Sequence, residues 1–80
     1  MAWTIYILEC ADKTLYTGIT NDMEARLAKH IKGTGAKYTR GRAPFKIVYT
    51  EHRRVKGHAL KRERQIKSLT RTQKLGLIGG

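Results

Sequence analysis

Two short runs near the N-terminus, each rich in β-branched and aromatic residues, constrain the fold of this chain more than any other feature. The runs are Trp3–Glu9 and Thr14–Thr20, and a short polar stretch, residues 11–13, separates them. This composition is typical of β-strands, and strands joined by so short a connection pair in an antiparallel hairpin. The sequence therefore predicts that the chain begins with a β-hairpin.

Alternation along the two strands sorts their side chains onto opposite faces, because successive residues of a strand point to opposite sides. Tyr6 then leaves the face that carries its isoleucine neighbours, while Tyr16 and Gly18 share one face of the second strand. A turn centred on Ala11 would place Tyr6 and Tyr16 opposite one another, and a slip of one residue would separate them. The register stays open at this level.

The rest of the chain is predicted to contain helices, one more strand and a loop. Residues 22–32, 55–69 and 71–78 have apolar residues at helical spacing, and residues 46–52 have strand composition. Residues 33–44 contain three glycines, the only proline and three cations, which together indicate a loop. We expect this loop to contact the substrate.

Positive charge is concentrated in the downstream part of the chain. Seventeen Lys and Arg against six Asp and Glu give a formal charge of +11, and sixteen of the cations lie at or after Arg26, where only Glu51 and Glu63 are acidic. Such an excess favours a polyanionic partner, so we expect the phosphate-facing surface there, with DNA or RNA as the partner. The simpler alternative is a basic protein that binds no nucleic acid.

The length of the chain and its pattern of apolar residues limit the number of domains and the cellular location that we expect. A chain of 80 residues buries only about 60% of its unfolded surface, which predicts a single domain, residues 1–80. The lone Cys10 lies in an apolar strand, which favours a buried thiol and fits a reducing compartment. Since we find no membrane-length apolar run and no secretory leader, we expect a cytoplasmic protein that does not associate with membranes.

Glu63 occupies a position that calls for a partner. On the helical wheel of residues 55–69 it lies with Ala59 and Ile66 on the inward face, where an unpaired carboxylate would be costly. A salt bridge to Lys67 or Arg62 explains the position as well as a divalent metal ion does, and both alternatives remain open. One carboxylate with waters and substrate phosphate is a usual arrangement around Mg²⁺.

Arg26 and His30 lie one helical turn apart, beside the apolar stripe of their helix. A guanidinium can hold a phosphate with two hydrogen bonds, and a histidine can exchange protons near neutral pH. Taken alone, Arg26 is interpreted as a solvated cation on a helix, and Tyr6 and Tyr16 as ordinary aromatic residues of β-strands. A phenol, with a pKa of about 10, becomes a useful base only where a cation or a metal ion lowers that pKa.

The order of these residues resembles the GIY-YIG endonuclease superfamily. The signatures appear as Thr4-Ile5-Tyr6 and Tyr16-Thr17-Gly18, followed by Asn21, Arg26, His30 and Glu63. Residues 33–40 and 44–49 resemble the small stand-alone branch of the superfamily, so the likeness covers nearly the whole chain. Either triplet alone is a weak signal, whereas the ordered set is a strong one.

The resemblance implies an α/β domain of the α+β type, with a three-stranded antiparallel sheet flanked by helices. Thr4 replaces the first glycine of the family name and Thr17 replaces its second isoleucine, but both tyrosines are present. Gly18 is expected to allow a close approach to the backbone. Residues 64–80 lack the late asparagine of many relatives, which favours cutting directed by DNA structure over cutting directed by sequence.

The resemblance also implies roles for the site residues in the hydrolysis of DNA phosphodiester bonds. Tyr6 and Tyr16 are the signature tyrosines, one of which orients or deprotonates the attacking water. Arg26 stabilises the pentacovalent phosphate and His30 assists proton transfer. Glu63 binds one divalent cation, Mg²⁺ or Mn²⁺.

The loop cations are the expected nucleic-acid contacts, and they are Lys37, Arg40 and Arg42. The main alternative function is a catalytically weak nucleic-acid-binding module that keeps the nuclease fold. A ribosome-associated basic protein would explain the charge but not the ordered set, and the cysteine and histidines show no zinc-ligand spacing. Whether a protein partner supplies specificity stays open.

Overall fold

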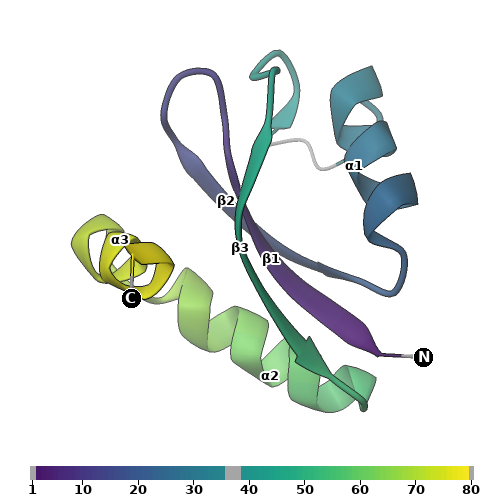
Figure 1. Ribbon diagram of the computed structural model, residues 1–80, viewed down its shortest axis with the longest axis vertical. Coiled ribbons are helices and arrows are strands. Elements are labelled where there is room, and N and C mark those ends of the chain that lie inside the picture. Colours follow the sequence, from purple (N-terminus) through teal and green to yellow (C-terminus); the bar gives the residue numbers. More distant parts are fainter. Residues whose placement is uncertain (1, 36–38, 80) are drawn as a thin grey trace.

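The computed structural model, which describes residues 2–35 and 39–79, is a three-stranded antiparallel sheet flanked by three helices (Figure 1). This confirms the predicted fold class, and the elements begin and end within about two residues of their predicted bounds. They are β1 (Trp3–Glu9), β2 (Leu15–Thr20), α1 (Met23–Lys32), β3 (Lys46–Arg53), α2 (Lys56–Lys67) and α3 (Arg71–Gly79).

The sheet has the strand order β2-β1-β3, so the first strand is the central one. Glu9 pairs with Leu15, which centres the turn on Asp12 instead of Ala11. Tyr6 consequently lies opposite Gly18, and not opposite Tyr16. Moving the centre of the turn from Ala11 to Asp12 shifts the pairing of the strands by two residues. Two residues are one full period of a strand, so the two tyrosines still share one face of the sheet.

The two faces of the sheet are covered by different helices: α1 lies on one side, and α2 and α3 lie on the other (Figure 1). Ile5 and Ile7 of β1 pack against Ala59 and Ile66 of α2 to form the apolar core. Thr17 lies opposite Ile7 on this face, and its Oγ1 is buried without a hydrogen-bond partner among the described residues. Tyr6 and Tyr16 lie on the α1 side, away from this core.

Helix α1 begins and ends at capping residues that set its position along the sheet. The side chain of Asp22 accepts a hydrogen bond from the backbone N–H of Ala25 at 3.2 Å. Gly33 ends the helix in the left-handed conformation, with φ 79°, and its backbone N–H donates hydrogen bonds to carbonyl oxygens of the last turn. Between these caps, Arg26 and His30 project toward the sheet face that carries Tyr6.

An ion-pair network joins β3 to α2 around Glu51. Arg62 donates to both oxygens of Glu51, through Nε at 3.0 Å and Nη2 at 2.9 Å, and Arg53 donates from Nη2 at 2.9 Å. The Tyr49 hydroxyl also donates to this carboxylate. The hydrogen bonds from Arg62, ahead of those from Tyr49 and Arg53, lower the pKa of Glu51 from 4.5 to about 2.

We expect Glu51→Gln to destabilise the fold at neutral pH and to do so less as the pH falls. The folded pKa lies below the unfolded one, so this stabilisation is complete above about pH 4.5 and disappears toward pH 2. The free energy of unfolding, measured by urea titration, should fall by about 2 kcal/mol at pH 7 and much less at pH 2.5.

The matched control for this substitution is Glu9→Gln. Glu9 pairs only loosely with Lys13, at 3.8 Å, and the lysine side chain is 76% exposed. Such a pair contributes little, so the control should change stability by less than about 0.5 kcal/mol. Equal losses in the two variants would contradict the assignment of the network as a structural anchor.

Candidate functional site

The candidate site is centred on the hydroxyl of Tyr6, whose side chain β1 directs toward α1. Tyr6 is fully buried, and its hydroxyl lies 2.9 Å from Nε2 of His30. Arg26 Nε donates a hydrogen bond to the same oxygen at 3.3 Å. One strand and one helix therefore bring together three of the residues predicted for the site, and they do so by direct hydrogen bonds.

Tyr16 completes the aromatic part of the cluster from β2. Its ring centroid lies 6.3 Å from that of Tyr6 and 5.3 Å from that of His30. Unlike Tyr6, it is only half-buried. The pKa of the Arg26 guanidinium is raised, mainly by its hydrogen bond to Tyr6 and also by one to Tyr16, so Arg26 is a fixed cation between the two phenols.

Two glycines provide the space that the cluster needs. A Cβ at Gly18 would lie 2.5 Å from the Tyr6 hydroxyl, and a Cβ at Gly35 would lie 2.7 Å from Nδ1 of His30. At Gly18, a side chain would meet the phenol of Tyr6. The sequence did not indicate a role for Gly35, because a glycine at this position predicts a loop but does not reveal that a histidine packs against it.

Burial controls the protonation of the cluster. Desolvation raises the pKa of Tyr6, and the Arg26 hydrogen bond opposes that rise without cancelling it. Desolvation also lowers the pKa of His30, with a further contribution from the nearby Arg26 charge. At neutral pH, Tyr6 is therefore a protonated phenol and His30 a neutral imidazole.

Glu63 projects from the inward face of α2, and its side chain is only 15% exposed. Burial and the neighbouring Tyr16 raise the pKa of Tyr6 more than the charge of Glu63 does. Lys67 forms the predicted ion pair with Glu63 at 3.5 Å, whereas Arg62 pairs with Glu51 instead. Of the two salt bridges predicted for Glu63, only that with Lys67 forms.

The donor set at Glu63 fits a weakly held Mg²⁺ or Mn²⁺ and not a tightly caged ion. Within residues 2–35 and 39–79, no three His, Cys, Asp or Glu side chains lie together as a metal cluster. A largely buried carboxylate whose ion-pair partner, Lys67, is half exposed can exchange that partner for a cation. Mg²⁺ commonly binds through one carboxylate, with waters and phosphate oxygens as its other ligands.

The three predicted nucleic-acid contacts have different structural outcomes. Lys37 lies outside the described residues, and Arg40 is exposed. Arg42 pairs with Asp12, and its carbonyl oxygen accepts a hydrogen bond from the N–H of Ala11 at 2.8 Å. Arg42 thus ties the loop to the hairpin turn.

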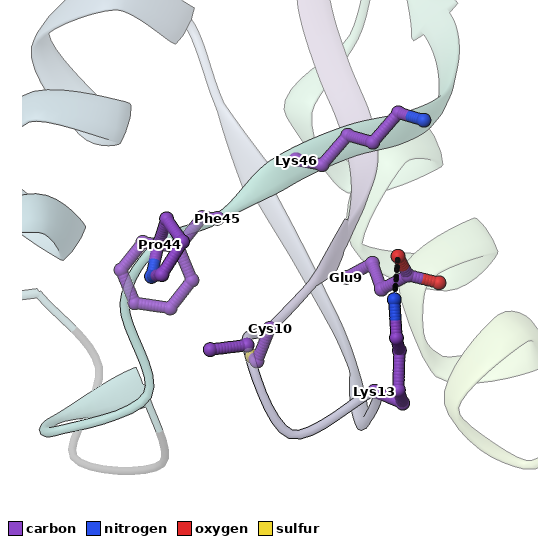
Figure 2. A pocket seen from close by; sticks show the side chains of 7 residues that line it. Glu9, Cys10, Lys13, Pro44, Phe45 and Lys46 are labelled. Atoms are coloured by element: carbon purple, nitrogen blue, oxygen red, sulfur yellow. Dashed lines mark ion pairs between the residues drawn. The ribbon is translucent and has the colours of Figure 1, made fainter.

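A pocket of about 280 Å³ lies at the turn end of the β1–β2 hairpin (Figure 2). Pro44 and Phe45 form one wall, and the Glu9–Lys13 ion pair lies across from them. The Phe45 ring also meets the His30 ring edge-on, at 6.0 Å between centroids. Cys10 lines the pocket but is only 3% exposed and unpaired, which confirms the buried thiol.

Among the described residues, none of the helices combines the length and apolar character that crossing a membrane requires.

Comparisons with known proteins agree with this architecture. A family model described as the GIY-YIG catalytic domain matches residues 2–76. A UPF0213 protein of Natronomonas pharaonis is 53% identical over 74 residues, which cover 92% of this chain and 87% of the relative. A UPF0213 protein of Clostridium perfringens is 57% identical over 74 residues, covering 92% and 80% respectively.

Solved structures extend the similarity to the fold. The solution NMR structure of the UPF0213 protein BH0048 from Bacillus halodurans superposes with a TM-score of 0.64 at 46% identity, covering 99% of this chain and 84% of that one. The solution NMR structure of EF2693 from E. faecalis gives a TM-score of 0.67 at 38% identity, covering 96% and 83%.

Proposed function

We propose that this chain, which belongs to the GIY-YIG family of catalytic domains, is a metal-dependent endonuclease that hydrolyses DNA phosphodiester bonds. We further propose that it selects DNA by structure more than by sequence. The observation that carries this proposal is the cluster in which Arg26 and His30 bond the buried hydroxyl of Tyr6. A domain that only binds nucleic acid has no need of such a cluster.

Arg26 is the group that would hold the scissile phosphate. Its Nε is engaged by Tyr6, which restrains the planar guanidinium. A guanidinium carries five N–H donors in a fixed fork, so it can hold Tyr6 and still donate to a phosphate. Because its raised pKa keeps it charged, it can stabilise the negative charge that grows on the phosphate during hydrolysis.

Tyr16 is our choice for the phenol that meets the attacking water, and Tyr6 for the one that orients Arg26. Tyr6 is fully buried, and its hydroxyl already bonds His30 and Arg26. Tyr16 is half-buried and lies in the same aromatic cluster. The neutral His30 has a nitrogen lone pair and can accept a proton released in the cluster.

Glu63 would hold the divalent cation by giving up its ion pair with Lys67. When bound, such an ion supplies positive charge that stabilises the reacting phosphate and lowers the pKa of nearby water. The small number of protein ligands implies that binding of the ion and binding of DNA reinforce each other, since phosphate oxygens complete the coordination.

DNA is the proposed partner because of the charge of +11 and the cations in and after the loop. Arg40, next to the buried Thr39, is exposed and suited to contact a phosphate. A protein partner could add specificity, since a chain of 80 residues has little surface to spare for reading sequence. The free, buried Cys10 is compatible with a reducing cytoplasm.

We expect DNA binding to weaken steeply with salt and to show little preference for sequence. If three or four phosphates are contacted, affinity should fall roughly a hundredfold between 50 and 200 mM salt. Fluorescence anisotropy with one duplex and its scrambled versions measures both properties. Arg40→Gln should reduce the slope of log affinity against log salt by about one unit.

Equal affinity at both salt concentrations would remove the electrostatic basis of this prediction. Tight binding to one duplex and not to its scrambled versions would instead argue for sequence recognition.

The catalytic proposal is tested by incubating the protein with supercoiled, single-stranded and branched DNA, with Mg²⁺, with Mn²⁺ and with a chelator. Cleavage that requires a metal ion and favours branched DNA would support the proposal. Absence of cleavage under every condition would favour the second candidate, a nucleic-acid-binding module with the nuclease fold. One observation favours that candidate: Glu63, the proposed metal ligand, already forms an ion pair with Lys67.

A further inference from the structure

A buried contact links the tyrosine cluster to the loop between α1 and β3. Nδ1 of His30 lies 2.8 Å from Oγ1 of Thr39, and each of these residues is 1% exposed. His30 is therefore held on both nitrogens, by Tyr6 on one side and by Thr39 on the other. Sequence reasoning assigned no role to Thr39.

The directions of these hydrogen bonds follow from what each group can donate. Arg26 has no acceptor, so its Nε–H donates to the Tyr6 oxygen. A buried Tyr6 hydroxyl must direct its own proton to an acceptor, and among the described residues only Nε2 of His30 lies within hydrogen-bond distance to take it. Nε2 then carries no proton, which leaves the proton of the neutral imidazole on Nδ1. Nδ1–H faces Thr39, whose hydroxyl oxygen can accept it.

We infer that Thr39 is a positioning residue: by accepting from Nδ1–H of His30, it fixes the tautomer that lets Tyr6 hold Arg26. The hydrogen bonds run in one direction, from Arg26 to Tyr6, from Tyr6 to His30 and from His30 to Thr39. A series of hydrogen bonds that runs in one direction is cooperative, because each bond polarises the group that makes the next one. The loop thereby controls the orientation of the guanidinium.

Loss of the Thr39 oxygen would reverse this arrangement. Without an acceptor at Nδ1, His30 would place its proton on Nε2 and donate it to the Tyr6 oxygen. That oxygen would then face two donors, and its own proton would have no acceptor among the described groups around it. Burial makes such a mismatch costly, so the contact between Tyr6 and Arg26 would be disturbed.

The test is to measure the His30 tautomer by long-range ¹H–¹⁵N NMR in the full chain, without metal and without DNA. We expect the Nδ1–H form in the wild type and in Thr39→Ser, which keeps a hydroxyl. We expect conversion to the Nε2–H form in Thr39→Val. Thr17→Val is the matched control, because Thr17 is also buried but has no hydrogen-bond partner in the described residues. It should leave the His30 tautomer unchanged.

The catalytic part of this inference rests on the proposed function, whereas the tautomer does not. If the protein cuts DNA, Thr39→Val should lower kcat by about 10- to 100-fold, with Thr39→Ser close to wild type. If it cuts nothing but the tautomers follow the expected pattern, the proposed function fails and the positioning role stands.

The inference is overturned by an Nε2–H tautomer in the wild type, a measurement that needs no variant. It is also overturned if folded Thr39→Val keeps the Nδ1–H form, or if it cuts DNA as well as wild type. Should Thr39→Val not fold, Thr39→Ala takes its place, and the wild-type tautomer still decides the outcome.

Discussion

Glu63→Gln is expected to abolish metal-dependent cleavage, by at least about a hundredfold in rate, while DNA affinity stays equal or rises. The substitution keeps the shape of the side chain and removes the only carboxylate of α2, which is largely buried and is the proposed metal ligand. Binding survives because a negative charge near phosphate is lost together with the metal ligand. Cleavage of branched DNA in Mg²⁺ and anisotropy in the absence of metal measure the two effects separately.

The control for Glu63→Gln is Glu24→Gln, which removes an exposed acid from the first turn of α1. It should leave cleavage unchanged. Arg26→Ala should instead weaken both binding and cleavage, since an arginine that contacts phosphate in both the ground state and the transition state contributes to each. If Glu63→Gln cuts as fast as wild type, Glu63 is only the ion-pair partner of Lys67 and the metal assignment is wrong.

Gly18→Ala is expected to cost both stability and activity, because the new methyl group has no room. Its carbon would lie 2.5 Å from the Tyr6 hydroxyl and 2.7 Å from the ring carbon that carries it. Tyr6 must therefore shift, and its hydrogen bonds to His30 and Arg26 lengthen or break. We expect about 2 kcal/mol less free energy of unfolding and a loss of cleavage of about a hundredfold.

Gly57→Ala is the matched control for Gly18→Ala. A Cβ at Gly57 meets nothing within 4 Å, and the residue lies in α2, where alanine is the better helix former. Stability measured by urea titration should therefore stay the same or rise slightly, and cleavage should not change. If Gly18→Ala instead matches this control in both measurements, close packing at Tyr6 does not matter for the site.

The candidate site could be predicted in part because its residues belong to elements with strong local patterns. Alternation placed each tyrosine on the face opposite the isoleucines of its own strand, and helical spacing placed Glu63 inward with Ala59. Those inferences depend only on periods of 2 and 3.6 residues, which local backbone geometry imposes. That Tyr6 and Tyr16 share one face was decided by the register of the hairpin. The choice between Lys67 and Arg62 as partner of Glu63 needed the fold, since it depends on Glu51 occupying Arg62.

The sequence by itself determined the element order, the faces of the strands and the basic character of the chain, because propensity, alternation and charge are properties of neighbouring residues. Only the tertiary structure decided the centre of the hairpin turn at Asp12, the anchoring of Arg62 by Glu51 and the contact of Thr39 with His30. Each of these contacts depends on which groups the fold brings together. Burial favours particular partners, because a polar group inside the protein without a hydrogen-bond partner is costly. Local patterns carry no information about that selection.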